Sequence, residues 1–384
     1  MNDVYLVGGV RTPIGKTGGV LRSVLPETLG AAVLNEILQR YRLQPETIDH
    51  ILFGNAVGPG GNIARVCSLA AGWPYSVPAM TVDTQCGSGL SAVNTAAAMI
   101  KAAEAELIVA GGVESTSLAP RRQFNPTDPR FAGTDVYYER APFSTPDIGD
   151  PDTGEAAEKL AALKDVSRED MDALALASHQ RAAKTRTDGL IKDIILPVAA
   201  EEKIVDYDEC IRANMSLALL RRMPPAFVKD GRVTAGNTCL KHDGAAALLL
   251  ASEKAVRRYG LKPAGKIVQT AIVGCDPNWF PLSPVPSIRQ LLAKEHLTLD
   301  DVAALEINEA FAVKILTCCR ELGYSLEKTN ILGGALAYGH PYGASGAIIL
   351  LHLLKALEQV DGKFGVAAIG AVGGQGISTL VERI

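Results

Sequence analysis

The chain has 384 residues, of which 47% are hydrophobic and 21% charged, a composition typical of a globular enzyme with more than one compact unit. Its formal net charge of −4 gives no electrostatic basis for binding nucleic acid or an anionic membrane surface. No stretch approaches the ~18 consecutive apolar residues of a membrane span, and the first residues show no basic leader. Seven cysteines without a Cys-x-x-Cys pair predict free thiols in a reducing cytoplasm, and no Cys/His cluster has metal-site spacing.

The first half of the chain leads to a cysteine at a predicted strand-to-helix turn. A β-type run over residues 78–82 precedes Cys86, and an Ala-rich helical pattern runs from Leu90 to about Ala105. Unpaired N–H groups and the positive dipole end of a helix N-terminus favour a thiolate over a thiol. Gly87 and Gly89 leave space for a substrate to approach the backbone. We therefore expect Cys86 to be an activated nucleophile.

A faint internal duplication relates the two halves of the chain. In the first half, Cys86 precedes a predicted helix, which is followed by a buried strand ending at Gly112. In the second half, His340 precedes a small-residue helix, which is followed by a buried strand ending at Gly374. Strands alternating with helices in both halves indicate a parallel or mixed sheet covered by helices. If the halves face one another, their equivalent helix N-termini bring Cys86 and His340 into one pocket.

The region between the halves, residues 119–227, differs from them in composition and in its hydrophobic pattern. Pro, Asp, Arg and Tyr cluster over residues 120–151 without clear periodicity. Helical patterns follow over residues 154–163 and 169–184, the second beginning after Ser167 at capping-box spacing. The pattern favours an inserted loop subdomain that covers a site, and a surface elaboration without such a role remains the alternative.

Asparagine and histidine complete a set of residues suited to acyl transfer. Asn308 follows a predicted strand, at whose carboxyl end α/β sites usually lie. His340 stands between Gly339 and Pro341, which indicates a position that something must approach closely. A cysteine thiolate can attack a thioester carbonyl while an imidazole takes the thiol proton and hydrogen-bond donors stabilise the oxyanion. The sequence alone therefore favours Cys86, His340 and Asn308 as catalytic residues.

Six short motifs occur in the order found in one known family. They are Arg11-Thr-Pro-Ile-Gly-Lys16, Cys86-Gly-Ser-Gly, Gly111-Gly-Val-Glu-Ser-Thr-Ser, Thr234-Ala-Gly-Asn237, Asn308-Glu-Ala-Phe and Gly339-His-Pro. By these motifs the chain resembles the thiolases, the acyl-CoA C-acyltransferase family, over nearly its whole length. The resemblance implies the α/β thiolase fold, five layers αβαβα built from two similar halves with an inserted loop subdomain. It also implies a homodimer or homotetramer, an N-terminal half over residues 1–118 and 228–262, a loop subdomain over 119–227 and a C-terminal half over 263–384.

The resemblance further implies roles for individual residues. Cys86 carries the acyl group, His340 activates it and, with Asn308 holding a water, forms the first oxyanion hole. The backbone N–H groups of Cys86 and Val372 are candidates for the second hole. The substrates are coenzyme A thioesters, with no covalently bound cofactor and no metal. The coenzyme A contacts carried over from the family are Arg212 at the nucleotide end and Phe227, Ala235, Cys239, Ala310 and Phe311 along the pantetheine.

The chain departs from the family pattern at several positions. The family's second cysteine, the base that removes an α-proton from the second acyl-CoA, is replaced here by Gly370, and Val372 replaces the first glycine of the triplet that follows. Loss of a general base typically costs ~10²–10⁴-fold in rate. Cys239 stands where the family has a serine, and the segment beginning at Asp152 replaces a His-Met-Gly type segment. Acylation of Cys86 does not need the missing base.

Several functions therefore remain open at this stage. The expected activity is acyl-CoA C-acyltransfer through an acyl-thioester on Cys86, in the lipid metabolism of the cytoplasm. Claisen condensation or thiolysis of 3-ketoacyl-CoA is implied by the family. Cys318, Cys319 or His340 could replace the missing base, or the acceptor could need no deprotonation, as in decarboxylative ketosynthase-like condensation. A non-catalytic acyl-CoA-binding protein is the alternative from another class.

Overall fold

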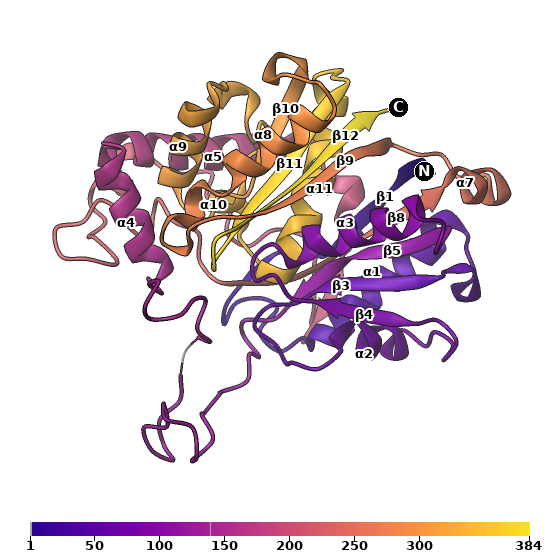
Figure 1. The fold of residues 1–384 in the computed structure, drawn as a ribbon, viewed down its shortest axis with the longest axis horizontal. Helices are drawn as coiled ribbons and strands as arrows, with labels where there is room; N and C mark the ends of the chain where they lie inside the picture. The colour runs from indigo at the N-terminus through magenta and orange to yellow at the C-terminus, as the bar shows by residue number, and fades with distance from the viewer. Residues whose placement is uncertain (1, 139) are drawn as a thin grey trace.

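The computed structural model describes residues 2–138 and 140–384, and within them ten strands form one mixed sheet (Figure 1). The N-terminal half contributes, in spatial order, β4 (Ala79–Val82), β3 (His50–Gly54), β5 (Leu107–Glu114), β8 (His242–Ser252) and β1 (Val4–Arg11). The C-terminal half continues with β9 (Gly265–Gly274), β12 (Gln375–Arg383), β11 (Phe364–Ala371) and β10 (Val302–Ile307). The short β2 (Gly15–Lys16) pairs with β8 beside this path.

The two halves of the sheet repeat one strand order. From each outer side toward the middle, β3-β5-β8-β1 corresponds to β10-β11-β12-β9. The first two strands of each series are parallel and the remaining pairs are antiparallel. The halves join where β1 pairs with β9 at Tyr5–Lys266 and Leu6–Gly265. This repeat confirms the two similar halves expected from the sequence.

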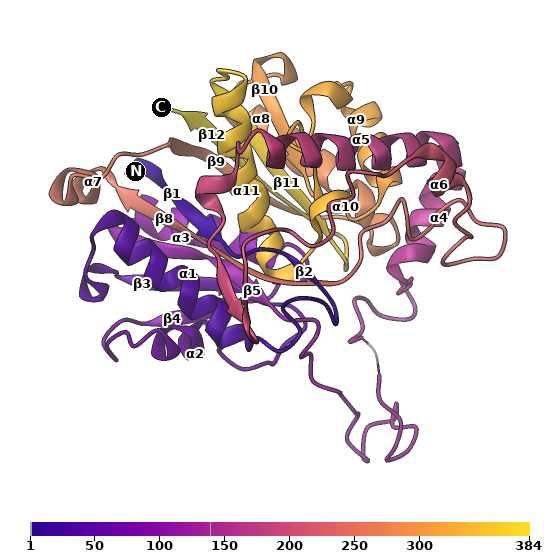
Figure 2. The same cartoon turned by 180° about the vertical axis from the view of Figure 1, so that it is seen from behind.

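The two halves of the sheet form two layers, and helices lie between them and on both outer sides, which gives five layers in all. The middle layer is α3 (Ser88–Lys101) and α11 (Tyr342–Gln359), which contact each other and strands of both halves. One outer layer, α1 (Pro26–Tyr41) and α2 (Ile63–Ala70), covers the N-terminal strands, and the other, α8 (Pro284–Lys294) and α9 (Ala312–Leu322), lies on the C-terminal side (Figure 2). Because helices cover both faces, β5 and β8 are buried along their whole length. The predicted αβαβα fold is confirmed.

The two middle helices meet backbone to backbone at their first turns. A Cβ atom built on Gly89 of α3 would lie 2.6 Å from the carbonyl oxygen of Gly343 in α11. A Cβ atom on Gly346 would meet the backbone of Leu90. Glycine at these positions therefore permits an approach that side chains would prevent. The contact sets the N-terminal ends of α3 and α11 beside each other.

The end of α3 differs from the sequence expectation. The Ala-rich pattern predicts a helix to about Ala105, whereas α3 ends at Lys101. Ala103 adopts a left-handed backbone with φ 62°, and the carboxylate of Asp49 accepts hydrogen bonds from the N–H groups of Glu106 and Leu107 at 2.7 and 2.9 Å. The alanines after Lys101 have high helical propensity, which is why the sequence predicts a longer helix. The chain must nevertheless turn at Ala103, because Asp49 binds the backbone at the start of β5.

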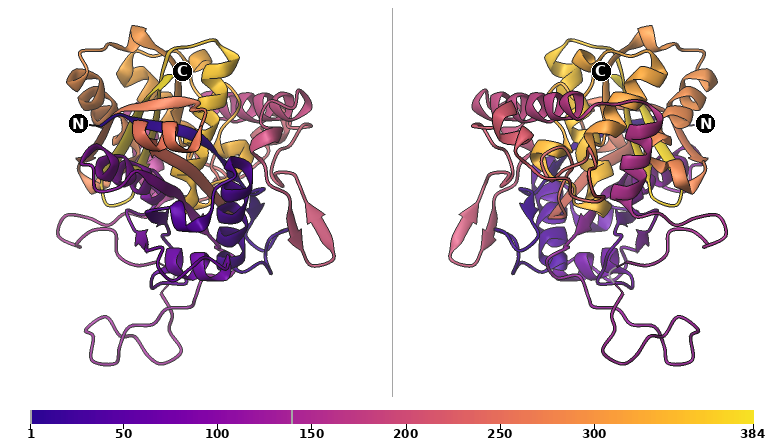
Figure 3. Two further views of the ribbon diagram at one scale, coloured as in Figure 1. Left: turned by 90° about the vertical axis from the view of Figure 1, so that its right-hand side faces the viewer. Right: turned by 90° about the vertical axis from the view of Figure 1, so that its left-hand side faces the viewer.

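The segment between β5 and β8 contains the predicted helices. They appear as α4 (Thr153–Leu163) and α5 (Arg168–Thr187), and Ser167 caps α5 by accepting a 3.0 Å hydrogen bond from the N–H of Asp170. The remaining elements are the hairpin β6 (Val198–Ala200) and β7 (Lys203–Val205), with α6 (Leu217–Arg221). The hairpin and the loop before α4 stand out from the body of the molecule (Figure 3). The limits of a separate loop subdomain stay a prediction.

Two further helices are short, α7 (Glu253–Tyr259) after β8 and α10 (Ala335–Tyr338) before α11. Within the described parts of the chain, no helix is both long and apolar enough to cross a bilayer.

A buried ion pair fastens the inserted segment to β1. Arg11 and Asp208 are both buried, and the guanidinium donates two hydrogen bonds of 2.7 Å to the carboxylate. Asp208 also accepts a 3.0 Å hydrogen bond from the N–H of Ile14. A bidentate, fully desolvated pair of this kind holds its geometry, but each charge is costly without the other.

We predict that Arg11→Met lowers the free energy of unfolding by about 3–5 kcal/mol, because it leaves Asp208 as an uncompensated buried charge. Arg22→Met is the matched control, since Arg22 pairs with Glu201 at 2.8 Å on the exposed surface and such pairs contribute about 0–1 kcal/mol. Chemical denaturation of the three proteins measures both values. Equal effects of the two substitutions would contradict a structural role for the buried pair.

Candidate active site

Cys86 lies on a tight turn just before α3. The preceding residue, Gln85, has a left-handed backbone with φ 55°, which is uncommon for a residue with a side chain. The hydroxyl of Ser88 accepts a 2.9 Å hydrogen bond from the N–H of Thr84 and donates a 2.5 Å bond to the carbonyl of Gln85. These bonds hold the strained turn closed, and strain of this kind gathers at functional sites. The turn presents the Cys86 thiol in a half-buried position.

His340 and Asn308 are in direct contact. The amide nitrogen of Asn308 lies 3.3 Å from Nε2 of His340, and Nδ1 of His340 lies 2.5 Å from the hydroxyl of Ser345. Because an amide nitrogen can only donate, these partners assign the neutral tautomer with the proton on Nδ1 and the lone pair on Nε2. The lone pair of Nε2, which can act as a base, therefore lies beside the side-chain amide of Asn308.

Loss of contact with water governs the protonation of both His340 and Cys86. Burial lowers the pKa of His340 well below its usual range, and the charges of Lys314 and His242 lower it further. Burial also raises the pKa of Cys86 to about 12, against a smaller lowering by the charge of Lys314. Desolvation thus opposes the effect of the helix dipole on which the expected thiolate depends, and burial favours the neutral form of both the Cys86 thiol and the His340 imidazole.

The start of α11 is fastened to the N-terminal half by Glu114 and His242. The Glu114 carboxylate accepts hydrogen bonds from the N–H groups of Gly343 at 3.0 Å and Ala56 at 2.9 Å, and burial raises its pKa to about 8. Nδ1 of His242 accepts a 3.0 Å bond from the N–H of His340. Through these bonds, residues of the N-terminal half hold the backbone around His340 and so position its imidazole.

The proposed coenzyme A contacts fall into two groups. Phe227 and Phe311 pack edge to face with ring centroids 6.1 Å apart, and the carbonyl of Ala310 accepts a 3.0 Å bond from the N–H of Cys239. The Cys239 thiol is close enough to Cys86 for the charge of Cys86 to raise its pKa, in addition to the larger effect of burial. The structure brings these four residues together on one side of the site. The remaining two, Arg212 and Ala235, are exposed.

Gly370 and Val372, the two residues that depart from the family pattern near the C-terminus, are both closely packed by their neighbours. Val372 is buried and packs against Ala156, Phe280 and Phe143. A Cβ atom built on Gly370 would lie only 2.6 Å from the hydroxyl oxygen of Ser283. That hydroxyl is held in place by hydrogen bonds to the carbonyls of Phe280 and Gln375 at 2.7 and 2.8 Å. Ser283 thus occupies the space that a side chain at position 370 would need.

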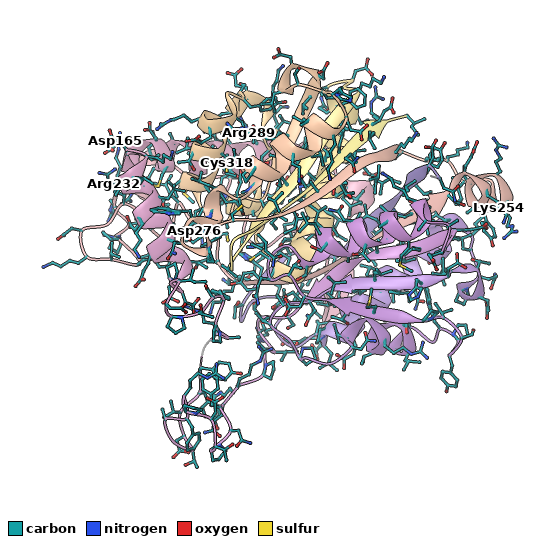
Figure 4. The ribbon with its side chains drawn as sticks, viewed as in Figure 1. Asp165, Arg232, Lys254, Asp276, Arg289 and Cys318 are labelled. Atoms are coloured by element: carbon teal, nitrogen blue, oxygen red, sulfur yellow. The ribbon has the colours of Figure 1, made fainter. Side chains whose placement is uncertain are left out.

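The two cysteines considered as substitutes for the missing base have packing roles. Cys318, in the C-terminal half (Figure 4), is fully buried and its thiol donates to the carbonyl of Pro281 at 3.5 Å. The Cys319 sulfur lies 3.4 Å from the hydroxyl of Thr329. The acid of Asp152 is paired at 2.7 Å with Arg140, so its charge is partly compensated.

Sequence reasoning missed four residues of the site: Ser283, His242, Ser345 and Lys314. Ser345 lies within the Gly-His-Pro motif region and could have been suspected from its hydroxyl. The others carry no local signal, because they reach the site from separate elements. Lys314 follows the Asn308 motif, and its wholly buried side chain is visible only in the structure.

Two cavities bear on the assignment of the site. One of about 20 Å³ is lined by Asn308, Ser345 and Glu306 and is just large enough for a water molecule. Oδ1 of Asn308 has no hydrogen-bond partner among the described residues. A larger cavity of about 360 Å³, between Arg40 and Lys355, includes none of the candidate catalytic residues. Within the described residues, no group of three His, Cys, Asp or Glu side chains could hold a metal ion.

We predict that Gly370→Ala lowers the free energy of unfolding by about 1–3 kcal/mol, because the new Cβ atom collides with the Ser283 hydroxyl. Ser283→Gly in the same chain removes the closest of three contacts under 3.0 Å, the others being 2.9 Å to the carbonyl oxygen of Phe280 and to Cδ of Pro284, so the double variant is less destabilised than the sum of the single ones. Urea unfolding of the three variants measures this interaction energy, expected at about 0.5–3 kcal/mol. Additive effects would show that the two positions do not compete for space.

We also predict the pH dependence of Cys86 alkylation. With a pKa raised to about 12, the thiolate fraction grows roughly tenfold per pH unit over the whole working range. Iodoacetamide labelling of Cys86, followed by peptide mass spectrometry, should therefore accelerate without a plateau between about pH 7 and about pH 10. A plateau below pH ~8 would contradict the protonated resting thiol.

Comparison with known proteins identifies the family. Residues 4–254 match the family described as thiolase, N-terminal domain, and residues 261–383 match thiolase, C-terminal domain. A Bacillus subtilis protein with the provisional name acetyl-CoA C-acetyltransferase YhfS is 42% identical over 385 residues, covering 100% of this chain and 99% of the relative. A similarly named Staphylococcus epidermidis protein, VraB, is 38% identical over 383 residues, with coverage of 100% and 99%.

Solved structures agree with the sequence relatives. The acetyl-CoA acetyltransferase of Bacillus anthracis superimposes with a TM-score of 0.93 at 35% identity, covering 100% of this chain and 99% of that one. Human mitochondrial 3-ketoacyl-CoA thiolase in complex with CoA gives a TM-score of 0.92 at 34% identity, with coverage of 100% and 98%. The chain therefore belongs to the thiolase family and is an acyltransferase similar to acetyl-CoA C-acetyltransferases.

Proposed function

We propose that this thiolase accepts an acyl group from an acyl-CoA as a thioester on Cys86 and passes it to an acceptor. The observation that carries the proposal is the meeting of the α3 and α11 N-termini, because the Cys86 turn comes directly before α3 and His340, in contact with Asn308, comes directly before α11. A thiol, a neutral imidazole whose Nε2 lone pair can accept a proton and an amide donor form a sufficient set for acyl transfer.

The first half-reaction follows from these groups. Nε2 of His340 takes the thiol proton while the Cys86 sulfur attacks the thioester carbonyl carbon. The tetrahedral intermediate collapses, the C–S bond to coenzyme A breaks, and the imidazolium returns the proton to the departing sulfur. Hydrogen-bond donors, the Asn308 amide region and the Cys86 backbone N–H, stabilise the oxyanion. The described chain shows no direct thiol–imidazole hydrogen bond, so the thiol must turn toward His340 when substrate binds.

Coenzyme A binding is proposed on the side lined by Phe227, Phe311, Ala310 and Cys239. The apolar ring pair suits a pantetheine arm, and the exposed guanidinium of Arg212 suits the nucleotide phosphates. A solved relative in the thiolase fold binds CoA, which supports this placement. We further propose a cytoplasmic homodimer or homotetramer that acts in lipid metabolism.

One observation favours a second candidate function. Gly370 cannot move a proton, and Ser283 closes the space beside it, so the carbon–carbon step lacks the family's base. A protein that binds acyl-CoA without turnover, or that condenses a decarboxylating acceptor, would not need that base. The intact set of Cys86, His340 and Asn308 favours the acyltransferase.

The decisive experiment is the intact mass of the protein after incubation with acetyl-CoA and longer acyl-CoAs. We expect an acyl adduct that Cys86→Ala abolishes, and His340→Ala should slow its formation by about 10²–10⁴-fold, the usual value of a general base. Cys275→Ala, which removes a partly exposed thiol elsewhere, is the matched control. Binding of acyl-CoA without any Cys86-dependent adduct would instead establish the binding protein.

A further inference from the structure

A lysine side chain is wholly buried beside the proposed site. Lys314 lies in the first turn of α9, with no exposed surface. Among the described residues it pairs with no carboxylate, and its Nζ instead donates to the carbonyl oxygen of Gly370 at 3.4 Å. An ammonium group without a counter-ion is costly to bury, so such an amine tends to be neutral.

The neighbours of Lys314 are the reacting groups of the site. The titratable side chains that sense its charge are the thiols of Cys86, Cys239 and Cys318 and the imidazole of His340. Burial lowers the pKa of Lys314, and the three thiols oppose that shift. The amine therefore contacts the backbone of position 370 and lies close enough to the proposed acyl-carrying thiol for its charge to affect that thiol.

Three other acids and thiols near the site are already engaged, whereas Oε1 of Glu306, in the small cavity beside Asn308, has no hydrogen-bond partner among the described residues. Glu114 accepts hydrogen bonds from the backbone of two elements. Glu309 accepts bonds from Ser178 at 2.6 Å and Asn330 at 2.9 Å, which tie α5 to the core. The Cys318 thiol points to Pro281. Lys314 has a single long hydrogen bond, so its lone pair and protons are available for transfer.

From this juxtaposition of a buried, unpaired amine with Cys86 and the carbonyl of Gly370, we propose that Lys314 is the acid–base catalyst of carbon–carbon bond formation. The inference rests on the proposed acylation of Cys86. It names the acceptor as an acyl-CoA with a hydrogen on its α-carbon and makes decarboxylation unnecessary. Lysine is a recognised general base when burial keeps it neutral.

The step balances as follows. The neutral Lys314 amine takes an α-proton from the acceptor acyl-CoA, which leaves a thioester enolate and an ammonium. The enolate carbon attacks the carbonyl of the acyl group on Cys86, and the C–S bond to Cys86 breaks as the new C–C bond forms. The ammonium returns its proton to the Cys86 thiolate. The products are a 3-ketoacyl-CoA, a neutral thiol and a neutral amine, and thiolysis is the reverse sequence.

The test measures α-proton exchange and acylation separately. Protein is incubated with acetyl-CoA in D2O, deuterium in the acetyl group is followed by mass spectrometry, and the Cys86 adduct is followed by intact mass. Lys314→Met keeps an unbranched stem without a base, and we expect exchange to fall by about 10²-fold or more while the adduct forms normally. Thr317→Val, on the same helix and also buried, removes a hydroxyl that bonds only to backbone carbonyls of α9, and this variant should exchange like the wild type.

Each result distinguishes the inference from the proposed function. Wild-type protein without a Cys86 adduct refutes the proposed function. A normal adduct with wild-type exchange in Lys314→Met refutes the role of Lys314 alone. If that variant does not fold, Lys314→Gln replaces it, because glutamine keeps a hydrogen-bond donor for the carbonyl of Gly370 but carries no base. Wild-type exchange in a folded Lys314→Gln variant would overturn the proposal.

Discussion

The backbone contact between the first turns of α3 and α11 is the constraint on which the rest of the molecule depends. Gly89 approaches the carbonyl of Gly343 so closely that a methyl group on either side would separate the helices. Because each helix begins just after a candidate catalytic residue, that separation would also move Cys86 away from His340. The central layer of the five-layer fold therefore determines the geometry of the candidate site directly.

Burial also controls the protonation of the reacting groups, because it favours the neutral form of each one. Desolvation raises the pKa of the Cys86 thiol and lowers those of His340 and Lys314. Each group is thereby driven to its neutral form. A site of neutral groups works by passing protons at the moment of reaction, in contrast to a preformed thiolate–imidazolium pair.

The departure from the family pattern at Gly370 is matched by local packing. Ser283 fills the space beside the glycine, with its hydroxyl bonded to two backbone carbonyls, and Lys314 approaches the carbonyl of the same residue. The position is therefore a packed and ordered part of the structure. A proton-transfer group supplied by α9 in place of the end of β11 keeps the acyltransferase chemistry of the family compatible with this change.

The sequence by itself determined the family, the two-half fold, and Cys86, His340 and Asn308 as candidates, because short motifs and strand–helix periodicity are local properties. The end of α3, the protonated state of Cys86 and the burial of Lys314 were decided only by the tertiary structure. Desolvation is the sum of atoms contributed by elements far apart in the chain. A local pattern carries no record of that sum, so the electrostatics of the site emerge only when the two halves close around it.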